Sequence, residues 1–144
     1  MGAGVTVFLD ACVIIYRVEA VAPFHLRFDA LLRELASTGD RSIAVSRLSL
    51  LECRTKPLRE GDAGLLACYD RFFDSPGLTI VELSPKVIDL ATQIRAHFML
   101  RTPDAIQAAS CLALGRDTPF VTADSAFGKV AGLRLRLLDT DPTG

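Results

Sequence analysis

Short apolar runs alternate along this chain with longer segments in which apolar residues recur every three or four positions. Short runs rich in Val, Ile and Leu are typical of buried strands, whereas the periodic segments are typical of helices with one face against a core. The runs predict strands at Val5–Leu9, Ile43–Val45, Leu78–Leu83, Phe120–Thr122 and Leu133–Leu138. The periodic segments predict helices at His25–Ser37, Ser46–Glu60, Asp62–Asp74, Lys86–Phe98 and Asp104–Leu114.

The alternation of these elements predicts an α/β fold. Strands that alternate with helices form a mostly parallel sheet with helices on both faces, an α/β/α sandwich. A chain of 144 residues corresponds to one domain and can bury its core without disulfides or structural metals. We therefore expect one domain with a five-stranded sheet over residues 1–138, followed by a short polar tail over residues 139–144.

Composition and charge narrow the class of protein. Half of the residues are apolar and 23% are charged, which is typical of a packed globular domain rather than a disordered chain. The 16 Lys and Arg residues nearly balance the 17 Asp and Glu residues, so nucleic-acid binding would need a local basic patch. The basic residues that we consider as phosphate contacts are Arg17, Arg47, Arg54, Arg101, Arg116 and Lys129.

The sequence also carries signals of location. No apolar run is long enough to span a membrane, and the N-terminus lacks the pattern of a secretory signal. The cysteines form no CxxC pair, and each lies among apolar residues, so we expect reduced, buried thiols in a cytoplasmic protein. These cysteines are Cys12, Cys53, Cys68 and Cys111. His25 and His97 have no partner at metal-binding spacing, and we interpret both as structural or surface residues.

Four isolated acids in apolar surroundings indicate a shared site. Asp10 follows the first predicted strand and Asp124 follows the fourth, at the strand ends where α/β sheets place functional groups. Glu52 and Asp104 lie on predicted helices, and Thr122 supplies a hydroxyl able to orient a carboxylate or a metal-bound water. Buried carboxylates are costly and clustered ones repel, so a divalent cation would offset both effects. Oxygen-only ligands favour Mg²⁺ or Mn²⁺.

Each acid also has an ordinary structural interpretation. The two acids that follow strands could cap the segments behind them. Glu52 could be an exposed helical residue paired with Lys56. Asp104 could interact with the dipole of its helix, two positions after a Thr102 cap.

The order and spacing of four pieces of sequence carry a resemblance to a known family. The pieces are Phe8–Asp10, Glu52 on its helix, Leu100–Ala109 and Val121–Phe127. Together they resemble the PIN domain, and most closely the VapC-type toxin of VapBC toxin–antitoxin pairs. The Leu-Arg-x-x-Asp-Ala block is the most specific of these motifs.

The resemblance implies a metal-dependent endoribonuclease that hydrolyses phosphodiester bonds of tRNA, rRNA or mRNA. It matches Asp10, Glu52, Asp104 and Asp124 to the acidic metal-binding quartet of the family, and Thr122 to the accompanying hydroxyl. The implied cofactor is Mg²⁺ or Mn²⁺. The implied partners are a second copy of the chain and a cognate antitoxin that blocks the acidic site.

Two departures from the family pattern keep other functions open. Cys12 stands where the family often has Asn, and Ala126 stands where an acid often precedes the final Phe, whereas Ser46 matches a hydroxyl often found before the Glu helix. The alternative is therefore a catalytically weak or inactive PIN-like module that acts by binding a partner or RNA. A phosphotransfer enzyme or receiver with Asp10 as acceptor is a third interpretation, against which Cys12 and the absence of an acid at Leu83-Ser84 both count.

Overall fold

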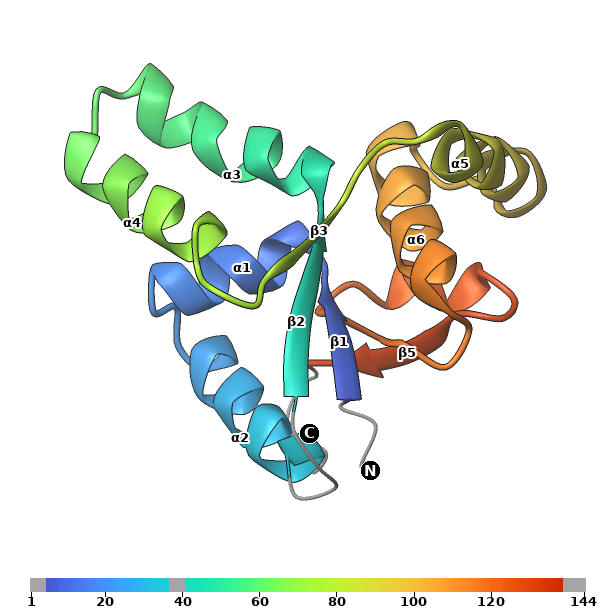
Figure 1. The fold of residues 1–144 in the computed structure, drawn as a ribbon, viewed down its shortest axis with the longest axis horizontal. Coiled ribbons are helices and arrows are strands. Elements are labelled where there is room, and N and C mark those ends of the chain that lie inside the picture. Colours follow the sequence, from blue (N-terminus) through green and yellow to red (C-terminus); the bar gives the residue numbers. More distant parts are fainter. Residues whose placement is uncertain (1–4, 37–40, 139–144) are drawn as a thin grey trace.

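The chain folds around one parallel sheet. The computed structural model describes residues 5–36 and 41–138 (Figure 1). Its strands are β1 (Val5–Leu9), β2 (Arg41–Ser46), β3 (Thr79–Val81), β4 (Pro119–Thr122) and β5 (Arg134–Leu137). They lie in the order β3-β2-β1-β4-β5, and every neighbouring pair is parallel. This confirms the five-stranded α/β fold that the alternating pattern predicts.

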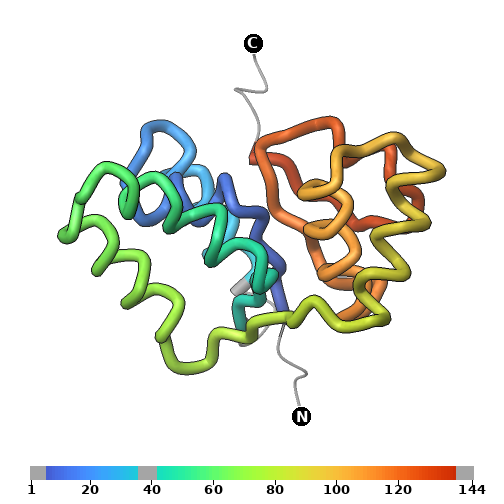
Figure 2. The backbone as a smooth tube through the Cα atoms, turned by 90° about the horizontal axis from the view of Figure 1, so that it is seen from above, coloured from blue at the N-terminus to red at the C-terminus, as the bar shows by residue number. Residues whose placement is uncertain are grey.

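Helices cover both faces of the sheet. They are α1 (Ala11–Val18), α2 (Phe24–Ala36), α3 (Arg47–Arg59), α4 (Ala63–Phe73), α5 (Pro85–Phe98), α6 (Thr102–Leu114) and the 3₁₀ helix η1 (Ser125–Lys129). Helices α1 to α4 lie on one side, and α5 and α6 lie on the other (Figures 1 and 2). Each face of the sheet has its own hydrophobic core, one beneath α1 to α4 and one beneath α5 and α6. Because successive strand residues face opposite sides, Val7 and Leu9 lie in the core beneath α1 to α4 and Phe8 lies in the core beneath α5 and α6.

Capping residues define the starts of three helices. Ser46 accepts a hydrogen bond from the Leu48 backbone at 3.1 Å, and Asp62 accepts one from the Leu65 backbone at 3.0 Å. Ser84 does the same for Val87 at 3.2 Å. These side chains satisfy backbone donors that a helix start leaves free, so the helices begin one residue after each cap.

The predicted Thr102 cap is wrong. Thr102 is the first residue of α6, and Arg101 occupies the cap position without a side-chain hydrogen bond to the helix. The Arg101 carbonyl accepts from the Ala105 backbone at 2.9 Å, which closes the first turn around Pro103. Proline fits here because it lacks only a donor that the first turn does not use.

The first helix and one edge strand also differ from the prediction. Helix α1 occupies the apolar run behind Asp10, where the sequence indicated only a turn or a helix start. That run has no polar face because α1 is buried on several sides, with Val13 and Ile14 fully buried. Strand β3 is shorter than Leu78–Leu83, because this edge strand pairs only with the three last residues of β2.

The strand order separates this fold from that of receiver domains. Receivers have the order 2-1-3-4-5, which differs from the order found here, and this removes the receiver interpretation. In the described ranges, no helix is both long enough and apolar enough to cross a bilayer. The predicted tail over residues 139–144 and the predicted helix end at Ser37 lie outside the described residues.

Candidate functional site

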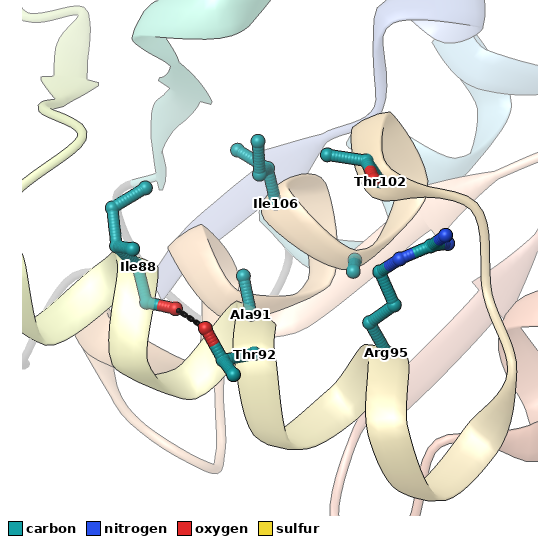
Figure 3. Close-up of a pocket in the computed structure, with 7 residues that line it drawn as sticks. Ile88, Ala91, Thr92, Arg95, Thr102 and Ile106 are labelled. Atoms are coloured by element: carbon teal, nitrogen blue, oxygen red, sulfur yellow. Dashed lines mark hydrogen bonds between the residues drawn. The ribbon is translucent and has the colours of Figure 1, made fainter.

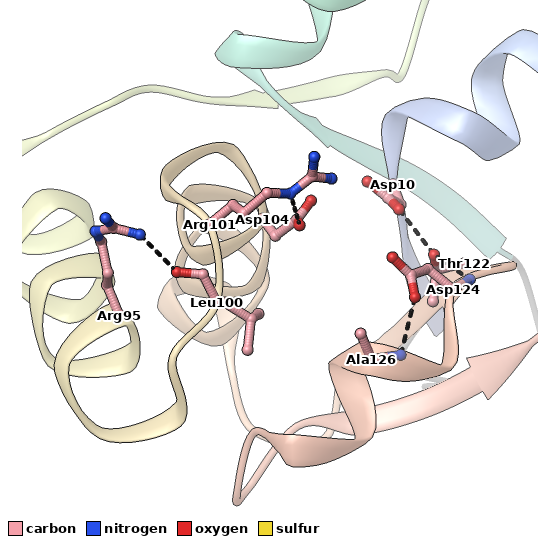
Figure 4. Close-up of polar contacts among 8 residues, drawn as sticks. All are labelled: Asp10, Arg95, Leu100, Arg101, Asp104, Thr122, Asp124 and Ala126. Carbon is pink, nitrogen blue, oxygen red and sulfur yellow. Dashed lines mark hydrogen bonds and ion pairs between the residues drawn. The ribbon is translucent and has the colours of Figure 1, made fainter.

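The candidate site lies at the carboxyl edge of the central strands. Asp10 directly follows β1, Thr122 ends β4, and Asp124 precedes η1. Glu52 comes from α3 and Asp104 from the first turn of α6. Figure 4 shows Asp10, Asp104 and Asp124 arranged around the same region although they belong to three different elements. The fold therefore gathers these residues from distant parts of the chain at the edge where α/β sheets form their sites.

Asp10 is almost completely buried and fully hydrogen-bonded. Its Oδ1 accepts from the Ala11 backbone at 2.8 Å, which makes it the N-cap of α1. Its Oδ2 accepts from the Thr122 hydroxyl at 2.7 Å and from the Cys12 thiol at 3.4 Å. Asp10 therefore caps the following helix, as its ordinary interpretation predicted, and the Thr122 hydroxyl contacts the carboxylate as one of its two predicted roles requires. Burial nevertheless raises the pKa of Asp10, and the charge of Asp104 raises it further.

Glu52 is half-buried and does not pair with Lys56. Its Oε1 accepts from the Gln107 amide nitrogen at 2.8 Å. Burial raises the pKa of Glu52, and the charges of Asp10 and Asp104 raise it further, whereas the Gln107 hydrogen bond and the Arg101 charge lower it. The three carboxylates therefore repel one another, which is the electrostatic signature of one acidic cluster.

Asp104 lies within the cluster beside one exposed cation. Arg101 Nε approaches Asp104 Oδ2 at 3.3 Å, and the Arg101 side chain is 83% exposed while that of Asp104 is 23% exposed. The turn before them is held by Arg95, whose Nη1 donates to the Leu100 carbonyl at 2.8 Å (Figure 4). An exposed ion pair of this kind contributes about 0–1 kcal/mol, so Arg101 can leave Asp104 easily.

Asp124 joins the site through hydrogen bonds. Its backbone nitrogen donates to the Thr122 hydroxyl at 3.1 Å, and the same hydroxyl donates to Asp10. Its Oδ1 accepts from the Ala126 backbone at 2.9 Å, so Asp124 also caps η1, as the ordinary interpretation predicted. Asp124 itself is exposed.

The donor chemistry of the acidic cluster fits a hard divalent cation. Its carboxylates offer only oxygen ligands, which suit Mg²⁺ and Mn²⁺. Within residues 5–36 and 41–138, no three Asp, Glu, His or Cys side chains converge closely enough to form a ready-made metal group. The acids would therefore have to move closer together around a cation. A bound cation would also relieve the repulsion that raises the pKa values of Asp10 and Glu52.

Sequence reasoning did not predict the buried hydrogen bonds that join polar side chains of α6 to those of α3 and its Ser46 cap. Gln107 donates to Ser49 Oγ at 2.9 Å as well as to Glu52, and the Ser110 and Ser46 hydroxyl oxygens lie within hydrogen-bond distance at 3.2 Å. All except Glu52 are fully or almost fully buried. A signal for Gln107 is present, because it is a polar residue in an Ala-rich stretch, three positions after Asp104 on the same helix face.

The thiol of Cys12 acts as a hydrogen-bond donor at this site. Burial raises its pKa to about 12, and the charge of Asp10 adds to that rise. The thiol is therefore protonated at neutral pH and donates weakly to Asp10, in place of the amide that an Asn would provide. Of the cysteines, Cys53 and Cys111 are buried as expected, whereas Cys12 and Cys68 are only partly buried.

The basic candidates differ in their surroundings. Arg101 borders the acidic cluster, whereas Arg17 pairs with Asp29, Arg47 with Glu82 and Arg54 with Asp70. Arg116 follows the far end of α6, which lies about 15 Å along the helix from Asp104. His25 is partly buried, and exposed His97 bonds to Gln93, which agrees with structural or surface roles.

A separate pocket lies between α5 and α6. Its volume is about 120 Å³, and it is lined by Ile88, Ala91, Thr92, Arg95, Thr102, Ala105 and Ile106 (Figure 3). None of the candidate acids lines it. The acidic cluster at the strand ends, and not this pocket, is therefore the candidate functional site.

Comparisons with known proteins agree with this geometry. Three solved structures with the same fold are VapBC2 from Rickettsia felis bound to a promoter DNA fragment, FitAcB from Neisseria gonorrhoeae, and VapBC-5 from Mycobacterium tuberculosis. Their TM-scores are 0.72, 0.70 and 0.59, at 18%, 18% and 17% identity. The alignments cover 94%, 92% and 94% of this chain and 99%, 97% and 98% of those chains.

The family itself follows from the sequence match. No curated protein sequence matches this chain. The PIN-domain family, however, matches residues 7–133, which include every residue of the candidate site. The chain therefore belongs to the PIN-domain family.

Proposed function

We propose that this protein is a metal-dependent endoribonuclease that hydrolyses RNA phosphodiester bonds. The observation that carries the proposal is the acidic cluster at the carboxyl edge of the sheet, where buried Asp10 and the partly buried Glu52 and Asp104 lie close enough to repel one another. Titratable groups held in such unfavourable surroundings are concentrated at functional sites. Membership of the PIN-domain family supports a nuclease as that function.

We further propose that the nuclease is the toxin of a toxin–antitoxin pair. The similar structures are described as VapBC2, a VapBC family toxin–antitoxin system and, from Klebsiella pneumoniae, a toxin–antitoxin complex. The proposed partners are RNA as substrate, a cognate antitoxin that covers the acidic cluster, and a second copy of the chain. This role places the protein in the cytoplasm, together with its RNA.

The residues of the site have distinct proposed roles. Asp10, Glu52 and Asp104 would hold Mg²⁺ or Mn²⁺, and Asp124 would complete the site directly or through water. When bound, such a cation lowers the pKa of a water ligand and stabilises the leaving oxygen of the phosphodiester. Thr122 keeps the Asp10 carboxylate in place by its hydrogen bond and keeps Asp124 adjacent through its own oxygen.

The direct test is RNA cleavage by the purified chain freed of any partner. We expect cleavage of a mixed pool of structured RNA with Mg²⁺ or Mn²⁺ and none with EDTA, because the carboxylates cannot position and activate water alone. Gel or sequencing readout of the products measures it. Cleavage at the same rate in EDTA would contradict the metal-dependent mechanism.

Arg101 is expected to bind a substrate phosphate. Its guanidinium is exposed beside Asp104, and its charge reaches Glu52. The Arg101 guanidinium contacts Asp104 Oδ2, an oxygen that a cation would use. The Arg101→Ala variant should therefore bind Mn²⁺ at least as tightly as the wild type. The same variant should raise KM for RNA, because a phosphate contact is lost.

Steady-state cleavage and Mn²⁺ titration measure these two effects separately. Arg116→Ala is the matched control, since that arginine lies at the opposite end of α6 and should change neither quantity. Unchanged KM in Arg101→Ala would show that phosphate binding depends on other residues.

A catalytically weak or inactive module is the second candidate function. The observation that favours it is the local chemistry at the two departures: a weakly donating thiol contacts Asp10, and Ala126 offers only its backbone to Asp124. Retained binding of RNA or a partner, with no cleavage under any metal, would support this function instead.

A further inference from the structure

Gln107 is a fully buried side chain that uses only part of its hydrogen-bonding capacity. It is 1% exposed. Its Nε2 donates to Glu52 Oε1 at 2.8 Å and to Ser49 Oγ at 2.9 Å. Its Oε1 is buried and has no hydrogen-bond partner in the part of the chain that the structure describes. The amide therefore has both donors satisfied and its acceptor unsatisfied.

Packing alone does not account for an amide at this position. Burying an acceptor without a partner is unfavourable, and an apolar side chain of similar length would avoid that penalty. The neighbouring helix positions Ala105, Ala108 and Ala109 are apolar and fully buried. The nitrogen must face Glu52, because an ionised carboxylate accepts hydrogen bonds but donates none. The orientation of the Gln107 amide therefore gives the Glu52 carboxylate a donor and leaves the amide oxygen without a partner among the described residues.

The position of Gln107 links two of the candidate ligands. It lies three residues after Asp104, and residues at this spacing share one helix face. Helix α6 therefore supplies the Asp104 carboxylate and also holds the Glu52 carboxylate of α3. Only Oε1 of Glu52 is engaged, and Oε2 accepts no hydrogen bond from the described residues. A carboxylate held at one oxygen presents the other in a defined direction, as carboxylates that ligate metals commonly do.

We propose that Gln107 is a positioning residue that holds Glu52 for a divalent cation at the acidic cluster. This inference rests on the proposed metal-dependent function, but it is tested by metal binding and not by RNA cleavage alone. Removing a hydrogen-bonding partner of a metal ligand typically weakens metal binding by about 10–100-fold.

The test is Mn²⁺ titration of the metal-free full chain by calorimetry, comparing the wild type with Gln107→Met. Methionine has a similar length and no hydrogen-bond donor. We expect Gln107→Met to bind Mn²⁺ about 10–100-fold more weakly. We also expect its thermal midpoint without metal to stay close to that of the wild type, because removing the buried unsatisfied oxygen offsets the loss of the hydrogen bond to Ser49 Oγ. A purely structural role for Gln107 would instead lower the midpoint and leave Mn²⁺ affinity unchanged.

Ser110→Ala is the matched control. Ser110 lies three residues further along the same buried face. Its hydroxyl donates to the Ile106 carbonyl and lies within hydrogen-bond distance of Ser46 Oγ, but no hydrogen bond joins it to Glu52. Its variant should bind Mn²⁺ as the wild type does. If Gln107→Met does not fold, Gln107→Asn keeps the amide but falls short of Glu52, and it should weaken Mn²⁺ binding in the same way.

A double variant shows whether Gln107 acts through Glu52. In a Glu52→Gln background, Gln107→Met should cause no further loss of Mn²⁺ affinity. An equal loss in both backgrounds, wild-type affinity in Gln107→Met, or a wild-type chain that binds no Mn²⁺ would each overturn the inference. A wild type that binds Mn²⁺ but cleaves no RNA contradicts the nuclease function and leaves the test of Gln107 valid.

Discussion

Replacing Asp10 with Asn is expected to reduce RNA cleavage by more than about 100-fold. Removing a residue that only supports a metal ligand costs up to about 100-fold, and Asp10 is proposed to be a ligand itself. Asp10 is the most deeply buried of the candidate ligands and directly follows the end of β1. An Asn keeps the oxygen that caps α1 through the Ala11 backbone, but it loses the charge that would bind the cation. The rate of cleavage in saturating Mn²⁺ measures this effect.

The Asp10→Asn variant should fold as well as the wild type in the absence of metal. Burial raises the pKa of Asp10 and the charge of Asp104 raises it further, which means that the ionised carboxylate destabilises the folded state at neutral pH. Removing the charge offsets the loss of the oxygen that accepts from the Thr122 hydroxyl, so the thermal midpoint should stay close to that of the wild type. Asp89→Asn on the exposed surface of α5 is the control for both measurements. Full cleavage by Asp10→Asn would exclude Asp10 from the catalytic site.

Adding Mn²⁺ or Mg²⁺ is expected to stabilise the metal-free protein strongly at neutral pH. A ligand at a hundred times its Kd stabilises the folded state by about 2.7 kcal/mol. At roughly 2–4 °C per kcal/mol for a chain of this size, the thermal midpoint should rise by about 5–10 °C. The reason is that the cation compensates the repulsion among Asp10, Glu52 and Asp104. Thermal unfolding followed by circular dichroism in EDTA and in Mn²⁺ measures the difference.

The pH dependence has opposite signs with and without the cation. The pKa values of Asp10 and Glu52 are raised above their ordinary values of 3.8 and 4.5. Without metal, their contribution to stability is therefore fully present below those ordinary values and is lost as the pH rises through the raised ones. The stabilisation by Mn²⁺ should be absent in acid, where the carboxyls are protonated. It should appear as the pH rises through the raised pKa values of Asp10 and Glu52.

Two comparisons show whether this stabilisation belongs to the acidic cluster. The Asp10→Asn variant should lose most of the stabilisation by Mn²⁺, so that its thermal midpoint rises much less in Mn²⁺ at neutral pH. A shift of the same size in acid and at neutral pH, or in the wild type and Asp10→Asn alike, would show that Mn²⁺ acts elsewhere on the chain.

Much of the fold was predictable because the pattern that specifies it is local. All five strands lie where apolar runs rich in Val, Ile and Leu predict them, and the helix starts at Ser46, Asp62 and Ser84 follow from capping side chains. The apolar run of α1 was ambiguous because it is buried on several sides and lacks a polar face. Helix α6 starts at Thr102, two residues before the predicted Asp104, because the Arg101 carbonyl and not a side-chain cap closes its first turn.

The acids themselves were also visible in the sequence, since a carboxylate in an apolar stretch is unusual wherever it occurs. Asp10 and Asp124 stand at strand ends, and Asp104 stands in the first turn of a helix after proline. Their joint role as a metal site remains a prediction. The alternative interpretation of Glu52, a pair with Lys56, is wrong, because the packing of α6 against α3 brings the Gln107 amide to its carboxylate instead.

Residue type, period and order along the chain were enough to predict the class of fold, the family and the candidate acids. Which groups meet depended instead on the packing of β1, β4, α3 and α6. That packing placed the Thr122 hydroxyl on Asp10 across 112 positions and the Gln107 amide on Glu52 across 55. It also set the burial that raises the carboxyl pKa values. Contacts between residues so far apart in the chain have no local pattern to encode them, because they exist only once the elements have packed.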